Sequence, residues 1–238
     1  MPDSLVYGPH PDQVINLYRN VHAKGKDIDN SNTYTIVLVH GGYWRERLTF
    51  ELMLPLVPLW TREGANVANV EYRRGPAAPW PLPLQDVQEA MYTIREHVPG
   101  KLIGVGHSVG GQLALLLNTG FDAVVALAPV TDVVKVYYAG LGEEAAAEYF
   151  QTSPGAQPGL FASASPINHS LGPTPVLIVH GENDERVPLC HSWDYARIQW
   201  SKKANIDMQL VGDLNHMGCI DPSHDIWKSV QTWLRQNL

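Results

Sequence analysis

The sequence Gly106-His107-Ser108-Val109-Gly110 follows an apolar run at residues 101–105 and precedes a leucine-rich run at 112–117. It matches the pattern G-x-S-x-G, in which a strand turns sharply into a helix and the serine stands at the apex. Such a turn holds the serine at an unfavourable backbone angle, so its neighbours are glycines, which have no side chain to clash. The N-terminus of the following helix favours negative charge beside the serine. The stretch therefore predicts an α/β chain that presents Ser108 as a nucleophile.

A second glycine motif, His40-Gly41-Gly42-Tyr43-Trp44, follows a strand-like run at residues 34–39. When a serine attacks a carbonyl, the resulting oxyanion must be stabilised by preorganised backbone N–H groups. One donor normally comes from the residue after the nucleophile, which is Val109 here. The other comes from a loop after an earlier strand, where glycines let the backbone approach the substrate. We therefore predict an oxyanion hole built from Val109 together with Gly42 or Tyr43.

A serine nucleophile also needs a histidine base and a carboxylate that orients the base. In this architecture the carboxylate follows the serine in the chain, at the carboxyl end of a later strand. The apolar run at 175–179 leads into His180-Gly181-Glu182-Asn183-Asp184-Glu185, and we favour Asp184 over Glu182 and Glu185. A more distant rival is Asp132, which follows the run at 123–128 and is alternatively a helix N-cap.

The base is predicted to be His216. It lies in the loop after the last strand-like run, at residues 205–211, and before the closing helix. The other histidines of interest occupy less suitable places. His191 and His224 lie in helix-like segments, and His169 lies in a connecting loop. His40 and His180 belong to strand-end turns, and His107 has a supporting position beside the nucleophile.

In these motifs the chain resembles the α/β-hydrolases of the esterase and lipase type, from about residue 34 to the C-terminus. The stretch 69–74, the segment 80–87, Ala164-Ser165-Pro166 and the His-Gly-x-x-Asp-x-x-Val-Pro run all add to this resemblance. The His-Gly-Gly-x-Trp form is similar to that of kynurenine formamidases and related small acyl hydrolases. The sequence departs from the lipase pattern at Tyr43, where a third glycine would stand, and at Val109, where alanine is common. Because backbone groups act at both positions, the departures leave the mechanism intact and the substrate open.

The alternation of strand-like and helix-like runs predicts an α/β fold with a mainly parallel central sheet and helices on both faces. An early strand at 14–18, in antiparallel orientation, and a helix at 84–98 belong to this pattern. We interpret residues 1–238 as a single α/β-hydrolase domain. The segment of about 131–171 breaks the rhythm and is either a small cap insertion or a plain crossover connection.

Composition restricts the partners. The 238 residues are 45% hydrophobic and 17% charged, as expected for a globular domain, and the net charge of −7 argues against nucleic acid or an anionic membrane as a partner. The N-terminal sequence lacks the features of a signal peptide, so a cytoplasmic location is expected. Cys190 and Cys219 are too few for a disulfide framework and lie in no metal motif. We predict no metal and no cofactor, and the oligomeric state, including a homodimer, stays open.

These observations predict a serine hydrolase that cleaves small carboxylic esters or formamide and amide bonds through an acyl-enzyme intermediate. A prolyl-oligopeptidase-like peptidase would share every motif, but such enzymes carry a large gating domain for which 238 residues leave no room. A non-catalytic binding protein of the same fold would normally lack one member of the Ser-Asp-His set. All three positions are filled here.

Overall fold

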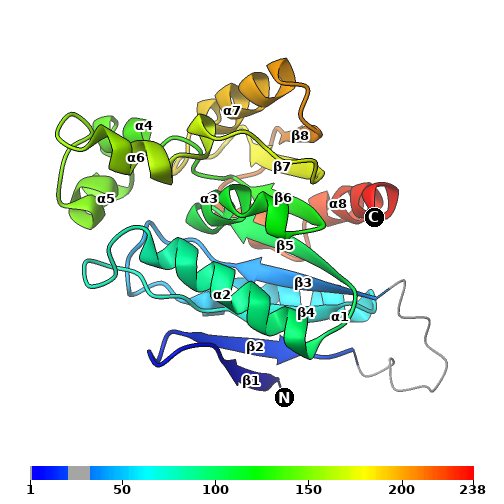
Figure 1. Ribbon diagram of the computed structural model, residues 1–238. Helices are drawn as coiled ribbons and strands as arrows, with labels where there is room; N and C mark the ends of the chain where they lie inside the picture. The colour runs from blue at the N-terminus through cyan, green and yellow to red at the C-terminus, as the bar shows by residue number, and fades with distance from the viewer. Residues whose placement is uncertain (1, 21–32) are drawn as a thin grey trace.

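The computed structural model describes residues 2–20 and 33–238, and a single sheet runs through them (Figure 1). The sheet has eight strands in the spatial order β1-β2-β4-β3-β5-β6-β7-β8. Their bounds are β1 Asp3–Val6, β2 Val14–Tyr18, β3 Tyr34–Val39, β4 Asn66–Val70, β5 Lys101–His107, β6 Ala123–Leu127, β7 Val176–Gly181 and β8 Ile206–Val211.

Only the first part of the sheet is antiparallel. β2 pairs antiparallel with β1 and with β4, whereas β4, β3, β5, β6, β7 and β8 are parallel to one another. Strands β3, β5, β6 and β7 are almost completely buried, as expected for parallel strands covered on both faces, and they read as continuous apolar runs. The edge strand β8 is only partly buried, and Asp207 and Gln209 interrupt its apolar residues. The predicted mainly parallel sheet, with its early antiparallel strand at 14–18, is confirmed.

Strand β3 lies between β4 and β5, so the chain first builds the sheet outward on one side of β3 and then on the other. In open α/β sheets the binding crevice forms outside the carboxyl ends of the strands at such a switch point. The loop that begins at His40 follows β3, and Ser108 follows β5. The two glycine motifs therefore meet at the edge of the sheet where a site is expected.

Helices cover both faces of the sheet, as the sequence predicts (Figure 1). On one face lie α2 (Leu82–His97), α3 (Val109–Leu116) and α7 (Cys190–Ser201). On the other lie α1 (Val57–Arg62), the 3₁₀ helix η3 (Phe50–Leu56) and α8 (Ile226–Asn237), joined by an edge-on contact between Trp60 and Trp227. The short 3₁₀ helices η4, η5 and η6 span Asn118–Gly120, Pro166–Asn168 and Met217–Ile220.

The segment 131–171 forms three short helices that gather at one side of the molecule (Figure 1): α4 (Val133–Tyr138), α5 (Leu141–Phe150) and α6 (Pro158–Ala164). Phe150 packs on Phe161 with ring centroids 4.7 Å apart, which joins α5 to α6. Tyr149 stacks on Trp44 at 5.5 Å, so the segment packs directly on the loop after β3. Its action as a cap, and the single-domain assignment, stay predictions.

None of the helices within residues 2–20 and 33–238 is long and apolar enough to cross a membrane. The cytoplasmic location and the open question of a homodimer stay predictions.

The helix after Ser108 begins earlier than the sequence indicated. The leucine-rich run predicts this helix over residues 112–117, but α3 starts at Val109. Gly110 and Gly111 are both helical, and their lack of a side chain serves packing. A Cβ at Gly110 would clash with the carbonyl oxygens of Val39 and His40, and one at Gly111 would lie 2.9 Å from Pro129. The helix can therefore press its first turn against the end of β3.

We expect Gly110→Ala to lower the free energy of unfolding by about 1–3 kcal/mol, because backbone atoms, which cannot swing aside, would have to move. The matched control is Gly159→Ala in α6, where an added Cβ meets nothing within 4 Å and alanine favours helix. Urea unfolding of the three proteins measures the effect. Equal midpoints for Gly110→Ala and Gly159→Ala would show that the elbow tolerates the extra atom.

Candidate active site

Ser108 stands between β5 and α3 in a strained conformation. Its φ and ψ angles are 57° and −117°, a backbone conformation that residues other than glycine rarely adopt. The turn is held because the Ser108 N–H donates to the carbonyl of Leu127 at 2.9 Å, which continues the β5–β6 pairing by one residue. The serine is 2% exposed, so it is almost completely buried.

Asp184 and His216 come together although they lie in different loops. The His216 Nδ1–H donates to Asp184 Oδ2 at 2.7 Å. The other oxygen, Oδ1, accepts the backbone N–H groups of Arg186 and Val187, each at 2.9 Å. An ionised carboxylate only accepts hydrogen bonds, so this contact fixes the proton of His216 on Nδ1 and leaves Nε2 as the basic nitrogen.

The environment keeps the Asp184 carboxyl ionised. Burial by itself would raise its pKa, but the hydrogen bonds from His180 and His216 outweigh burial and hold the pKa well below its usual range. His180 Nε2 lies 3.5 Å from Asp184 Oδ2, a contact that the sequence interpretation missed. The spacing of four residues in His-Gly-x-x-Asp is the signal that could have revealed it.

The rival carboxylates lie elsewhere. Asp132 is the N-cap of α4, where its Oδ1 accepts the Lys135 N–H at 3.1 Å. Among the described residues, Asp184 is the only one of the four candidate carboxylates that is hydrogen bonded to His216. Glu185 lines the neighbouring cavity, and Glu182 follows the end of β7.

His107 supports the loop that carries His216. Its Nε2–H donates to the His216 carbonyl at 3.0 Å, and the two rings lie 4.5 Å apart. Burial, followed by the proximity of His216, lowers the pKa of His107 to about 3, so this ring is neutral at physiological pH. Its Nδ1 is buried without a hydrogen-bond partner among the described residues, in agreement with a supporting rather than a proton-transferring role.

Within the described chain no hydrogen bond joins Ser108 Oγ to His216 Nε2. Such contacts are often long without substrate and shorten in the reacting complex. The residue before the serine, His107, packs against the His216 ring, with ring centroids 4.5 Å apart.

The loop after β3 lies against the serine. A Cβ at Gly41 would be 2.7 Å from the Cβ of Ser108, so only glycine lets the loop approach this closely. Gly42 and Tyr43 both have positive φ, 129° and 51°, which turns the peptide units of the loop. Val109 is the first residue of α3, and its N–H has no partner within the helix. The three predicted oxyanion donors thus come from segments in contact, and their role stays a prediction.

A buried polar network lies beneath this loop. The His40 ring bonds to Glu71 Oε1 at 2.8 Å and stacks on Tyr72, while the Arg74 guanidinium pairs with Glu71 at 2.6 Å. Burial opposes ionisation of Glu71, but the contacts with His40 and Arg74 lower its pKa. The hydroxyl of Tyr72 donates to the His40 carbonyl at 2.8 Å. The resemblance noted at 69–74 therefore reflects a support for the glycine loop.

Tyr43 connects the glycine loop to the loop of Asp184. Its hydroxyl donates to the carbonyl oxygen of Arg186, and burial raises its pKa to about 12. Trp44 points into the core, where its indole N–H donates to Gln112 Oε1 at 3.1 Å. Tyr43 thus joins the glycine loop to the loop of Asp184, and Trp44 anchors the glycine loop to α3.

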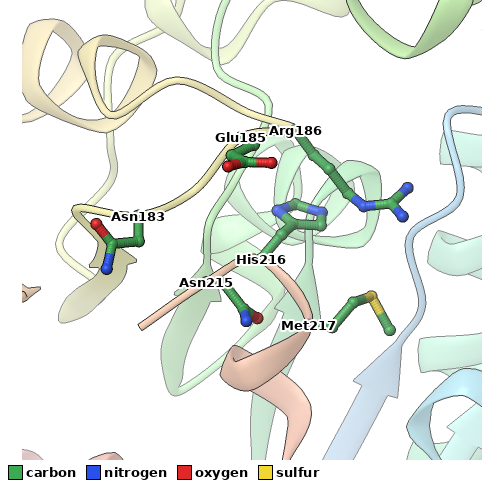
Figure 2. Close-up of a pocket in the computed structure, with 6 residues that line it drawn as sticks. All are labelled: Asn183, Glu185, Arg186, Asn215, His216 and Met217. Atoms are coloured by element: carbon green, nitrogen blue, oxygen red, sulfur yellow. The ribbon is translucent and has the colours of Figure 1, made fainter. Parts of the chain in front are cut away.

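A cavity of about 520 Å³ opens beside His216. Figure 2 shows the residues that line it: Asn183, Glu185, Arg186, Asn215, His216 and Met217. All belong to the two loops that follow β7 and β8. Within the described residues no group of three or more His, Cys, Asp or Glu side chains is placed to hold a metal ion.

The strand order and helical layers define the protein as a member of the α/β-hydrolase fold class. Within that class the chain belongs to the BD-FAE family, whose sequence pattern matches residues 25–198.

Two curated relatives are similar to parts of the chain. A kynurenine formamidase from Meyerozyma guilliermondii is 36% identical over 117 residues, which cover 48% of this chain and 42% of the relative. The esterase LipQ of Mycobacterium tuberculosis is 29% identical over 183 residues, which cover 66% of this chain and 43% of the relative. The chain thus spans less than half the length of these relatives.

Solved structures share the architecture at low identity. A truncated carbohydrate esterase from gut microbiota superposes with a TM-score of 0.79 at 19% identity, covering 98% of this chain and 94% of the other. Esterase B from Lactobacillus rhamnosis superposes with a TM-score of 0.76 at 19% identity, covering 98% and 82%. These likenesses show the fold.

We expect Asp184→Asn to reduce turnover by roughly 10⁴-fold without unfolding the protein, because an amide in place of the carboxylate favours the wrong tautomer of His216. The matched control is Asp132→Asn, which should keep full activity because asparagine is an equally good N-cap. Ester hydrolysis and circular dichroism of both variants measure the outcome. Loss of activity in Asp132→Asn with a near-normal Asp184→Asn would move the acid to the end of β6.

His107 should make the fold sensitive to acid. Its pKa is about 3 when folded and about 6.5 when unfolded, so between these values only the unfolded chain binds the proton. The free energy of unfolding should therefore decrease as the pH is lowered through this window. His107 should contribute about 1.4 kcal/mol of this decrease per pH unit. His107→Gln keeps a donor for the His216 carbonyl but does not titrate, so it should remove that part of the slope.

Urea unfolding of wild type and His107→Gln at pH 6.5, 5.5 and 4.5 measures the difference. The buried His191, whose pKa is lowered to about 4, titrates in both proteins and cancels in the comparison. Parallel pH dependences would mean that His107 is not the titrating group.

Proposed function

We propose that the protein is a serine hydrolase that cleaves small carboxylic esters or formamides through an acyl-enzyme intermediate. The observation that carries the proposal is the Asp184–His216 pair, held at 2.7 Å, beside Ser108 on its strained turn. The glycine loop that contacts Ser108 supplies the backbone that an oxyanion needs. No metal or organic cofactor takes part in the proposed reaction.

In the proposed reaction, Ser108 Oγ attacks the carbonyl carbon while His216 Nε2 takes the hydroxyl proton. Asp184 holds the ring and stabilises its cation. The oxyanion accepts hydrogen bonds from Val109 and from Gly42 or Tyr43. His216 then returns the proton to the departing alcohol or amine, and the acyl-serine remains. Water, deprotonated by His216, attacks this ester, releases the acid and restores Ser108.

Two substrate classes deserve separate tests. Esters are supported by the BD-FAE family and the relative named esterase LipQ. Formamides are supported by relatives named kynurenine formamidase and by the His-Gly-Gly-x-Trp form of the loop at 40–44. A panel of p-nitrophenyl esters of graded acyl length, assayed beside N-formylkynurenine, separates the two.

We expect a fluorophosphonate probe to label the wild type with one adduct at Ser108 and to leave Ser108→Ala unlabelled. Turnover of the best panel substrate should fall by about 10⁶-fold in that variant, as expected for loss of a triad nucleophile. Intact-mass and peptide mass spectrometry locate the adduct. Labelling of Ser108→Ala at the wild-type rate would remove Ser108 from the mechanism.

A further inference from the structure

Arg186 occupies a fixed place between the catalytic loops. Its backbone N–H donates to Asp184 Oδ1 at 2.9 Å, and its carbonyl oxygen accepts the hydroxyl proton of Tyr43. The backbone is thus anchored on one side to the acid and on the other to the glycine loop. A side chain on such a backbone starts from a defined position relative to His216.

The side chain itself is free to bind. It is exposed and lines the cavity beside His216, and no hydrogen bond or ion pair to its guanidinium is found among the described residues. Three other arginines near the glycine loop are paired: Arg45 with Glu148, Arg73 with Asp86, and Arg74 with Glu71. Arg186 is the only arginine that lines this cavity.

The charge of Arg186 reaches the catalytic centre. Burial and His216 are the main causes of the lowered pKa of His107, and Arg186 contributes to it as well. In Figure 2 the guanidinium and Met217 lie on one side of the His216 ring, and Glu185 and Asn183 lie on the other.

In the proposed reaction the cavity is the place for the leaving group, because His216 lines it. His216 hands its proton to the departing atom, so the space that His216 lines receives the departing alcohol or amine. The aromatic residues Trp44, Tyr149 and Phe150 lie away from this space, packed against one another.

We propose that Arg186 selects substrates whose leaving group carries a carboxylate, which it binds through charge-assisted hydrogen bonds in the cavity beside His216. The inference rests on the proposed hydrolase function and gives that function a substrate class: esters or amides of hydroxy acids or amino-substituted acids. A guanidinium matches a carboxylate in a planar, bidentate geometry that an ammonium does not reproduce.

The test compares acetyl esters that differ in one charge: 4-acetoxybenzoate and 3-acetoxybenzoate against the corresponding acetoxybenzamides. Each kcat/KM is divided by the rate constant for hydroxide-catalysed hydrolysis, which removes differences in leaving-group reactivity. The anion-to-neutral ratio should be about 10-fold lower in Arg186→Gln than in wild type, the loss expected for a hydrogen bond between charged groups. Arg186→Lys should retain part of the preference, and added salt should reduce the wild-type ratio.

The matched control is Arg197→Gln, which removes the same charge from an exposed position on α7 outside the cavity. Its ratio should equal that of wild type. An equal fall in both variants would reveal a general charge effect and overturn the proposal. An unchanged ratio in Arg186→Gln, in an enzyme that still hydrolyses the benzamides, would overturn it while leaving the hydrolase function standing.

Calorimetric binding to Ser108→Ala separates the two claims. The carboxylate site is supported if 4-hydroxybenzoate binds more tightly than 4-hydroxybenzamide and if adding Arg186→Gln removes this preference. This support stands even where the wild type turns over no ester, because absent turnover would refute only the hydrolase function. Equal binding of the two phenols counts against the carboxylate site, whatever the catalytic result.

Discussion

The backbone of Ser108 is the constraint on which the site depends. At φ 57° and ψ −117° it is strained, and it persists because its surroundings leave no alternative. The Ser108 N–H is tied to β6, and the absence of a Cβ at Gly110 lets the first turn of α3 lie against the end of β3. The same packing brings the glycine loop to the serine, so the proposed nucleophile and the proposed oxyanion donors are positioned by one set of contacts.

Asp184 has the corresponding function on the other side of the site. Its two oxygens are bound by His216 and by the N–H groups of Arg186 and Val187, which fixes the loop after β7 and orients the base in the loop after β8. The hydroxyl of Tyr43 then joins this loop to the glycine loop. The carboxyl ends of β3, β5, β7 and β8 thus form one connected structure.

The sequence predicted the features that depend on local pattern. Buried parallel strands read as apolar runs, and polar residues directly after them mark one edge of the sheet, which is how Ser108, Asp184 and His216 were predicted as a triad. The contacts that support them could not be read in this way. Tyr43 and Arg186 are 143 residues apart, and His107 meets the His216 carbonyl across 109 residues. These contacts follow from strand order and side-chain rotamers, which no local pattern encodes. The start of α3 lies three residues before the predicted one, because glycine is typical of turns as well as of closely packed helices.

The site combines a rigid half with an open half. On one face His216 is fixed by Asp184 and by the neutral His107, so the position and tautomer of the ring are set before substrate arrives. On the other face it borders a cavity whose lining includes Met217, 44% exposed, and the guanidinium of Arg186, which has no partner among residues 2–20 and 33–238. Under the proposed function, we expect substitutions in the rigid half to disturb the chemistry itself, because they change the tautomer or position of His216. We expect substitutions in the open half to change which leaving group is accommodated. Discrimination among substrates is therefore expected to reside in the few side chains that no internal hydrogen bond occupies.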